Sequence, residues 1–142
     1  MFTIRDASLS EIMKAHALVP EFGEGGDVDF AGRLSGTTSL SIIGLAGDAV
    51  AGYAVCYLKD NCTAYIWMVG TLPDYRRQGV YQQLFTHIHA WAVGQGATRL
   101  VLKTRNNKRH MLAWLVKNDF LFTEIEPQDD ISQNRILTEK LI

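Results

Sequence analysis

Residues 73–85 read P-D-Y-R-R-Q-G-V-Y-Q-Q-L-F, and they join a predicted strand to a predicted helix. Apolar residues recur from there at helical spacing, and they are Val80, Leu84, Ile88 and Trp91. This stripe predicts a helix with one buried side. The start of a helix carries unpaired N–H groups and positive dipole charge, so arginines are unfavourable there unless an anion binds. Arg76, Arg77 and Gly79 therefore predict an anion site at this helix start.

The two common nucleotide-binding patterns do not fit this turn. No G-K-[ST] follows the glycine, and the stretch lacks G-x-G-x-x-G. Sites for nucleoside triphosphates and for dinucleotides are therefore poor matches. A solvated turn whose glycine only starts the helix is the alternative interpretation of this segment on its own.

Strand and helix patterns alternate along the chain and predict one α/β domain with a mixed sheet, covering residues 1–142. Strand patterns cover residues 2–5, 40–46, 49–58, 64–72, 97–104, 120–125 and 135–141, and helix patterns cover 9–17, 30–34, 80–94 and 107–118. Ser8 and Glu11 form a capping box before the first helix, and the dipeptide Gly47-Asp48 predicts a hairpin. Gly70, inside a strand pattern, predicts a β-bulge or a close approach to the backbone. The segment 64–104 predicts a parallel strand–helix–strand crossover.

Composition excludes several classes of function. The 142 residues carry 14 Lys and Arg against 15 Asp and Glu, a formal net charge of −1, so no global field recruits nucleic acid or an anionic membrane. The longest apolar run, 49–58, is too short to span a bilayer, and the N-terminus lacks a leader pattern, so a cytoplasmic protein is expected. Cys56 and Cys62 lack metal-ligand spacing, and His87 and His89 should point to different sides of a helix, so we expect no metal site.

Six segments stand in a characteristic order: R-D-A-S near the start, I-W-M-V-G-T-L, P-D-Y-R-R-Q-G-V-Y, T-R-N-N-K-R-H-M-L and L-V-K-N-D-F in the middle, and N-R-I-L-T-E-K-L near the end. Together they span nearly the whole chain and resemble the GNAT superfamily of acyl-CoA N-acyltransferases. The family's acyl-CoA signature, [QR]-x-x-G-x-[GA], is matched at Arg76 and Gly79. The resemblance implies a single GNAT-like domain, with a mixed, mostly antiparallel sheet that is flanked by helices and has splayed middle strands.

The resemblance also implies acetyl-CoA as the acyl donor, and it assigns residues to the donor site. Backbone amides would hold the pyrophosphate, at Arg77, Gln78, Gly79, Val80 and Tyr81. The strand residues Val69, Gly70 and Thr71 would hydrogen-bond the pantetheine arm as an added strand does. Asn106 would contact the pantetheine or order the helix that follows.

Two positions depart from the family pattern. Tyr81 replaces the final small residue of the signature, so its phenol ring must find room beside the phosphates or turn away. Leu115 stands where many relatives carry a tyrosine that protonates the departing thiolate, and leucine cannot do so. The second departure leaves open whether the chain uses a general acid.

The remaining candidates concern catalysis and the acceptor. Glu21 is a candidate base in an acid-rich loop that also holds Glu24, Asp27 and Asp29. His110 is a candidate acid or base, and Trp67 is expected on the strand that faces the acceptor pocket. Surface or core roles are the alternative for each of these side chains.

The resemblance predicts an N-acetyltransferase that moves an acetyl group from acetyl-CoA to a primary amine of a small molecule or peptide, by direct attack. The alternative is a non-catalytic coenzyme A-binding or protein-interaction module on the same fold. A nucleotide-binding regulator fits less well because the Walker residues are missing. The partners expected are therefore acetyl-CoA and an amine, with no nucleic acid and no membrane, and the oligomeric state stays open, a homodimer included.

Overall fold

In the computed structural model, which describes residues 2–22 and 28–142, seven strands form one sheet in the order β1-β2-β3-β4-β5-β7-β6. The strands are β1 (Thr3–Asp6), β2 (Ser39–Ala46), β3 (Ala49–Leu58), β4 (Thr63–Thr71), β5 (Arg99–Arg105), β6 (Leu121–Glu126) and β7 (Arg135–Leu141). All neighbouring strands are antiparallel except β4 and β5, which are parallel and joined through a helix. The predicted mixed, mostly antiparallel sheet and the parallel crossover are confirmed.

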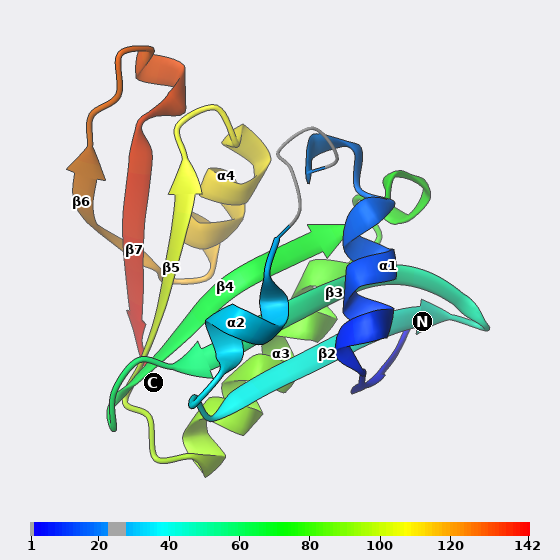
Figure 1. The fold of residues 1–142 in the computed structure, drawn as a ribbon. Helices are drawn as coiled ribbons and strands as arrows, with labels where there is room; N and C mark the ends of the chain where they lie inside the picture. Colours follow the sequence, from blue (N-terminus) through cyan, green and yellow to red (C-terminus); the bar gives the residue numbers. More distant parts are fainter. Residues whose placement is uncertain (1, 23–27) are drawn as a thin grey trace.

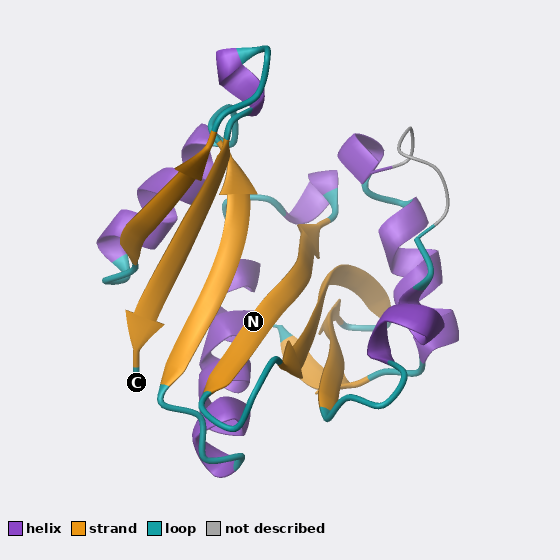
Figure 2. Ribbon diagram, turned by 60° about the vertical axis from the view of Figure 1, so that its left-hand side comes forward, coloured by secondary structure: helices purple, strands orange, loops and turns teal. Residues whose placement is uncertain are grey.

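Helices flank the sheet on both sides (Figures 1 and 2). The helices are α1 (Leu9–Ala17), α2 (Phe30–Leu34), α3 (Val80–Gly94) and α4 (Arg109–Lys117). α1 and α2 cover one face beside β2 and β3, where they bury a cluster around Tyr53 and Val55. α3 and α4 cover the other face and bury a larger cluster around Leu84, Leu100 and Leu115. Each helix therefore buries its apolar side on the sheet, as an amphipathic pattern predicts.

Local signals in the sequence produce the expected caps and turns. Ser8 and Glu11 form the predicted capping box at the start of α1. The predicted hairpin joins β2 to β3, and Gly47 in its turn has a φ of 62°. A left-handed residue of this kind matches the twist of a tight hairpin, and glycine adopts it at little cost.

The two middle strands separate after a short paired segment. Residues Thr63–Ile66 of β4 pair with Arg99–Leu102 of β5, and no pairing between these strands continues beyond them. On its other side, β4 keeps pairing with β3 as far as Thr71, with a register shift that leaves Trp67 as an extra residue between Ile66 and Met68. A bulge of this kind bends its strand, so the C-terminal half of β4 turns away from β5. The predicted splay is confirmed, and it opens between these two strands.

The bulge lies at Trp67 and not at Gly70, so the bulge prediction for Gly70 is wrong. Gly70 pairs in register with Tyr53. A Cβ at Gly70 would lie 2.5 Å from Cε1 of Tyr53 and 3.2 Å from a methyl group of Val19. Glycine is needed here because the Tyr53 ring lies directly over the backbone of β4. This is the close approach to the backbone that the sequence predicted as the alternative to a bulge.

Candidate active site

The turn before α3 has the backbone geometry of an anion site. It runs through a short 3₁₀ helix (Pro73–Tyr75) into Arg77 and Gly79, which have φ angles of 62° and 89°. Gly79 is the N-cap of α3, and among the described residues no side chain caps this helix. The first N–H groups of α3 therefore point out of the helix without a side-chain acceptor, which is the arrangement that binds phosphate.

A cleft of about 610 Å³ runs from this turn to the opening between β4 and β5. Its walls come from the 3₁₀ helix after α1, the end of β4, the turn, α3 and α4, and they include Glu21, Val69, Gly70, Thr71, Arg76, Arg77, Gly79, Val80, Tyr81 and His110. Most of the residues predicted for the donor site, together with both catalytic candidates, therefore line one cleft. Ligand sites in proteins are commonly clefts of this size.

Glu21 reaches the cleft from the 3₁₀ helix Pro20–Phe22 and forms an ion pair with Arg76 of the turn. The oxygen–nitrogen distance is 2.6 Å, and both side chains are partly exposed. Arg76 also donates from Nε to the carbonyl oxygen of Thr71 at 3.2 Å. The signature arginine thus links the end of β4 to the carboxylate of Glu21, so this candidate base is held at the cleft wall by a cation.

His110 lies at the start of α4, opposite the turn. Its Nε2 is 2.9 Å from a terminal nitrogen of Arg77. A guanidinium only donates, so Nε2 accepts this hydrogen bond and the proton of a neutral ring is on Nδ1. Lys108 and Arg109 line the cleft beside it. His110 is therefore part of a cationic cluster suited to an anionic ligand.

Tyr81, which replaces the final small residue of the family signature, is accommodated because its ring packs against α3. It makes an edge-to-face contact with Phe85, with ring centroids 6.3 Å apart. Burial raises the pKa of Tyr81, so the phenol is neutral at pH 7. Leu115, the second departure, is fully buried in the core between α4 and the sheet. It supplies no acid to the cleft.

Three of the predicted site residues do not line the cleft. The Asn106 side chain donates to the carbonyl oxygen of Ile131 at 3.2 Å and accepts from Arg109, while the next residue, Asn107, lines the cleft. The Gln78 side chain donates to the carbonyl oxygen of Asp74 at 2.9 Å. Trp67 lies on the α2 side of the sheet.

There the Trp67 ring is 5.2 Å from the ring of Phe30 and 5.0 Å from the guanidinium carbon of Arg33. This places Trp67 on the face opposite α3. Of the acid-rich loop, Glu24 and Asp27 lie outside the described residues. Asp29 caps α2 by accepting from the N–H of Gly32 at 2.8 Å.

A buried pair that no sequence pattern indicated lies behind one end of the cleft. His16 on α1 is only 8% exposed, and its Nδ1 is 2.5 Å from the hydroxyl oxygen of Tyr53. The His16 ring stacks on Phe22, a cleft residue, with centroids 5.0 Å apart. Its Nε2 has no hydrogen-bond partner among the described residues. Burial lowers the pKa of His16 and raises that of Tyr53, so both are neutral at pH 7.

No short motif could have identified this pair, because its members are 37 residues apart and meet only when α1 packs on β3. The available signal was the apolar face of α1. Ile12, Ala15 and His16 are buried on that face, and Val19, just after the helix, is buried in the same cluster as Ile12 and Ala15.

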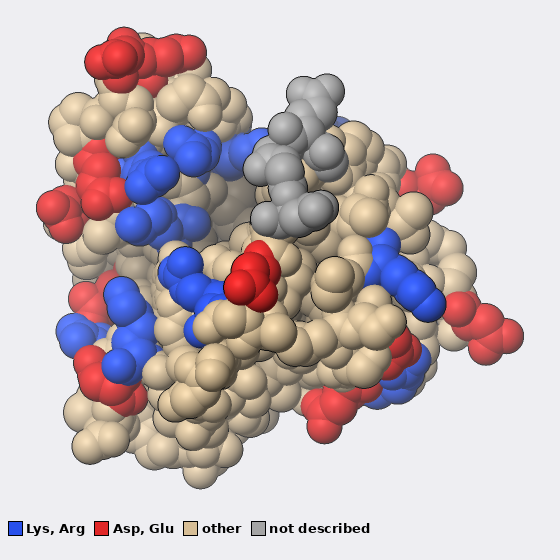
Figure 3. All heavy atoms as spheres, in the orientation of Figure 1, with Lys and Arg blue, Asp and Glu red and all other residues tan. Residues whose placement is uncertain are grey.

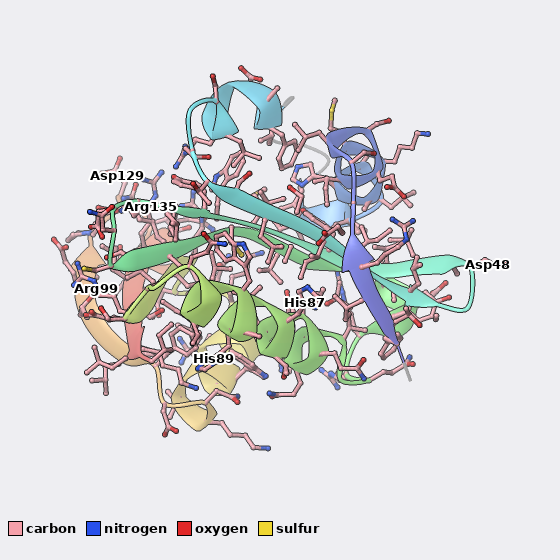
Figure 4. The ribbon with its side chains drawn as sticks, turned by 90° about the horizontal axis from the view of Figure 1, so that it is seen from below. Asp48, His87, His89, Arg99, Asp129 and Arg135 are labelled. Atoms are coloured by element: carbon pink, nitrogen blue, oxygen red, sulfur yellow. The ribbon has the colours of Figure 1, made fainter. Side chains whose placement is uncertain are left out.

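Neither a metal site nor a membrane span is found in the described part of the chain. Within residues 2–22 and 28–142, no group of three His, Cys, Asp or Glu side chains could hold a metal ion. His87 and His89 come from opposite sides of α3 (Figure 4). The described helices are all too short or too polar to cross a membrane.

Comparison with known proteins adds a family and a set of similar structures. The acetyltransferase (GNAT) family model matches residues 8–120. No curated protein sequence matches the chain. A GNAT family acetyltransferase from Elizabethkingia anophelis, solved with acetyl-CoA bound, is 17% identical and superimposes with a TM-score of 0.81 over 99% of this chain and 98% of that one.

Two further similar structures are an acetyltransferase named for its acceptor and one solved with a bisubstrate analogue. The ribosomal-protein-S18-alanine N-acetyltransferase from Escherichia coli is 18% identical, with a TM-score of 0.82 over 100% of this chain and 94% of that one. Naa50 from Arabidopsis thaliana, in complex with the bisubstrate analogue CoA-Ac-MVNAL, is 15% identical, with a TM-score of 0.79 over 98% and 97%. At these identities the similarity shows a shared fold.

Proposed function

Because the chain belongs to the acetyltransferase (GNAT) family, we propose that it transfers an acetyl group from acetyl-CoA to a primary amine. The observation that carries this proposal is the cleft, which joins an uncapped helix start to the opening between β4 and β5. One end suits a pyrophosphate, and the other suits an extended amide-containing chain.

The two ends of the cleft would bind different parts of the donor. The amides from Arg77 to Tyr81 and the side chain of Arg77 would hold the pyrophosphate, because they present N–H groups and positive charge at one point. The unpaired edge of β4 at Val69–Thr71 would hydrogen-bond the pantetheine amides as a neighbouring strand does. A helix start contributes only about 0.3–2 kcal/mol per charge, whereas micromolar binding needs about 8 kcal/mol, so both ends are required.

The reaction is a direct acyl transfer. The neutral amine attacks the thioester carbonyl carbon, a C–N bond forms and the C–S bond breaks. The proton lost by the amine is taken up by a base or a water chain, and the thiolate leaves. A thiol has a pKa of about 8.5, far below that of an alkylammonium ion, so the thiolate can leave without a dedicated acid. This chemistry is consistent with Leu115 in place of a tyrosine.

Glu21 is the side chain that we propose to receive the proton, directly or through water. It is the described carboxylate on the cleft wall, and Arg76 keeps it in place. We expect Glu21→Gln to lower kcat/KM by about tenfold or more, in the range of general-base effects. Glu11→Gln is the matched control, because Glu11 is also 39% exposed and also 2.6 Å from an arginine, but lies away from the cleft.

The alternative is a non-catalytic module that binds coenzyme A, and the buried Leu115 is the observation that favours it. Release of free thiol from acetyl-CoA, followed with a panel of amines, separates the two. Amine-dependent thiol release supports the enzyme. Tight coenzyme A binding by calorimetry, with thiol release no faster than without amine across the panel, would favour the module.

A further inference from the structure

The face of the sheet that carries α1 and α2 is open over β5, β7 and β6. Figure 1 shows that no described helix lies in front of these strands, and Figure 3 shows Lys and Arg side chains gathered there beside a hollow. Side chains of a strand alternate between faces, and Leu100 and Leu102 of β5 point into the core under α3. Val101, Lys103 and Arg105 therefore point to the open face.

Two arginines lie directly opposite each other on this face. Arg105 of β5 and Arg135 of β7 are Cα partners in the antiparallel ladder. Like charges at directly opposed positions destabilise a sheet. Arg105 lies in the half of β5 that no longer pairs with β4, so it borders the splay from the open side. This unfavourable pair is therefore placed where an acceptor would enter.

A third arginine reaches the same region from α2. Arg33 donates from Nε to the hydroxyl of Tyr57 at 3.1 Å, and its guanidinium lies over the rings of Trp67 and Tyr57. Arg33 lines a hollow of about 380 Å³ together with Tyr65 of β4, Val101 and Lys103 of β5 and Leu137 of β7. It therefore lies on the same open face as the two opposed arginines.

Two carboxylates of this face, Glu139 and Glu126, are paired with other cations. Glu139 pairs with Arg99 at 3.2 Å, and Glu126, although adjacent to Arg135 in the ladder, pairs with Lys103 at 3.3 Å. No described carboxylate forms an ion pair with Arg33, Arg105 or Arg135. Arg105 instead donates to the carbonyl oxygen of Gln133 at 3.2 Å, which leaves its positive charge uncompensated.

We propose that the acceptor amine carries its own anionic group, a carboxylate or a phosphate, which Arg33, Arg105 and Arg135 hold on the open face while the amino group reaches the thioester through the splay. This inference rests on the proposed function, and it names the class of acceptor. Planar guanidinium groups suit both anions, because each can donate two parallel hydrogen bonds to them.

The test uses matched amines that differ in charge. The first set is 4-aminobutyrate, 4-aminobutanamide and 1,4-diaminobutane, and the second is O-phosphoethanolamine against ethanolamine. We expect kcat/KM to be at least about tenfold higher for the anionic member of each set, and this preference to shrink as salt is added. The set with the larger preference identifies the anion. Equal rates within both sets, or a preference for the diamine, would overturn the proposal.

Arg135→Gln and Arg99→Gln form a matched pair of variants. Both residues are exposed arginines on the open face, but Arg99 is paired with Glu139 and lies at the opposite end of the β5–β7 ladder from Arg105. We expect Arg135→Gln to remove most of the preference for the anionic amine, by about tenfold, with the KM for acetyl-CoA unchanged. Arg99→Gln should keep the preference. An unchanged preference in folded Arg135→Gln would contradict the assignment.

A binding measurement separates this inference from the proposed function. The protein is saturated with coenzyme A, and the side-chain N–H signals of its arginines are followed by NMR as 4-aminobutyrate or O-phosphoethanolamine is added. Shifts at Arg33 and Arg135, together with no amine-dependent thiol release when acetyl-CoA replaces coenzyme A, would leave the anion site standing and refute the enzyme. Acetylation of amines without these shifts would leave the enzyme standing and refute the anion site.

Discussion

Replacing Gly79 with Asp tests the phosphate assignment at its most sensitive position. Gly79 lines the cleft at the start of α3, has a φ of 89°, and a Cβ there would meet no atom within 4 Å. The substitution therefore adds no steric clash within the protein. It costs backbone strain of about 1 kcal/mol, because an L-residue must adopt a left-handed conformation, and this lowers Tm by about 4 °C for a chain of this size.

The added carboxylate lies where the phosphates of the donor are expected. We expect the affinity for acetyl-CoA to fall by at least about tenfold, or about 1.4 kcal/mol, because the negative charge repels the phosphates and occupies the N–H groups of α3. Isothermal titration calorimetry gives the affinity, and thermal unfolding gives the strain. Gly79→Ala adds the Cβ without the charge, so it should lose less affinity.

Gly47→Asp is the control for strain. Gly47 also has a positive φ, 62°, and open space around its Cβ position, but it lies in the β2–β3 hairpin away from the cleft. It should lose a similar amount of stability and no affinity. Unaltered acetyl-CoA binding in folded Gly79→Asp, or an equal loss of affinity in Gly47→Asp, would refute the phosphate site.

Three further outcomes are expected. Leu115→Ala should lower the free energy of unfolding by about 2–5 kcal/mol in urea denaturation, because Leu115 is fully buried; a loss below about 1 kcal/mol would contradict its place in the core. Tyr53→Phe should cost about 1–3 kcal/mol, because it leaves Nδ1 of His16 buried without its partner, and an unchanged unfolding midpoint would argue against that hydrogen bond. Hydrogen bonding to Arg5 lowers the pKa of Glu11 to about 2. The ionised carboxylate therefore stabilises the fold at pH values above its ordinary pKa of about 4.5, and this contribution is lost as the pH falls toward 2. A Glu11→Gln variant whose stability falls equally over that range would show that Glu11 does not supply the contribution.

Features set by neighbouring residues could be predicted from the sequence. The capping box at Ser8, the hairpin at Gly47 and the helix after Gly79 each depend on a few consecutive side chains and their backbone preferences, and each is present. The family resemblance added the mostly antiparallel pairing and the splay of the middle strands, which no local pattern contains.

Features set by packing between distant segments could not be predicted in this way. The bulge, a shift in the β3–β4 register, lies at Trp67, whereas the backbone at Gly70 is contacted by the ring of Tyr53. The pair of Glu21 and Arg76 spans 55 residues, and it forms only when the loop after α1 meets the turn before α3. The choice between Asn106 and Asn107 depends on a backbone carbonyl of the β6–β7 connection, which the sequence pattern does not locate.

The short pairing of β4 with β5 divides the sheet into two parts. Four residue pairs connect a four-stranded part, β1 to β4, with a three-stranded part, β5 to β7, and the helices α3 and α4 pack against one face of the sheet. Beyond these four pairs, β4 and β5 each have an unpaired edge, whose amides exchange with solvent more easily than those of the paired strands. A ligand that pairs with either edge takes the place of a neighbouring strand, so its binding also raises the free energy needed to separate the two parts of the sheet.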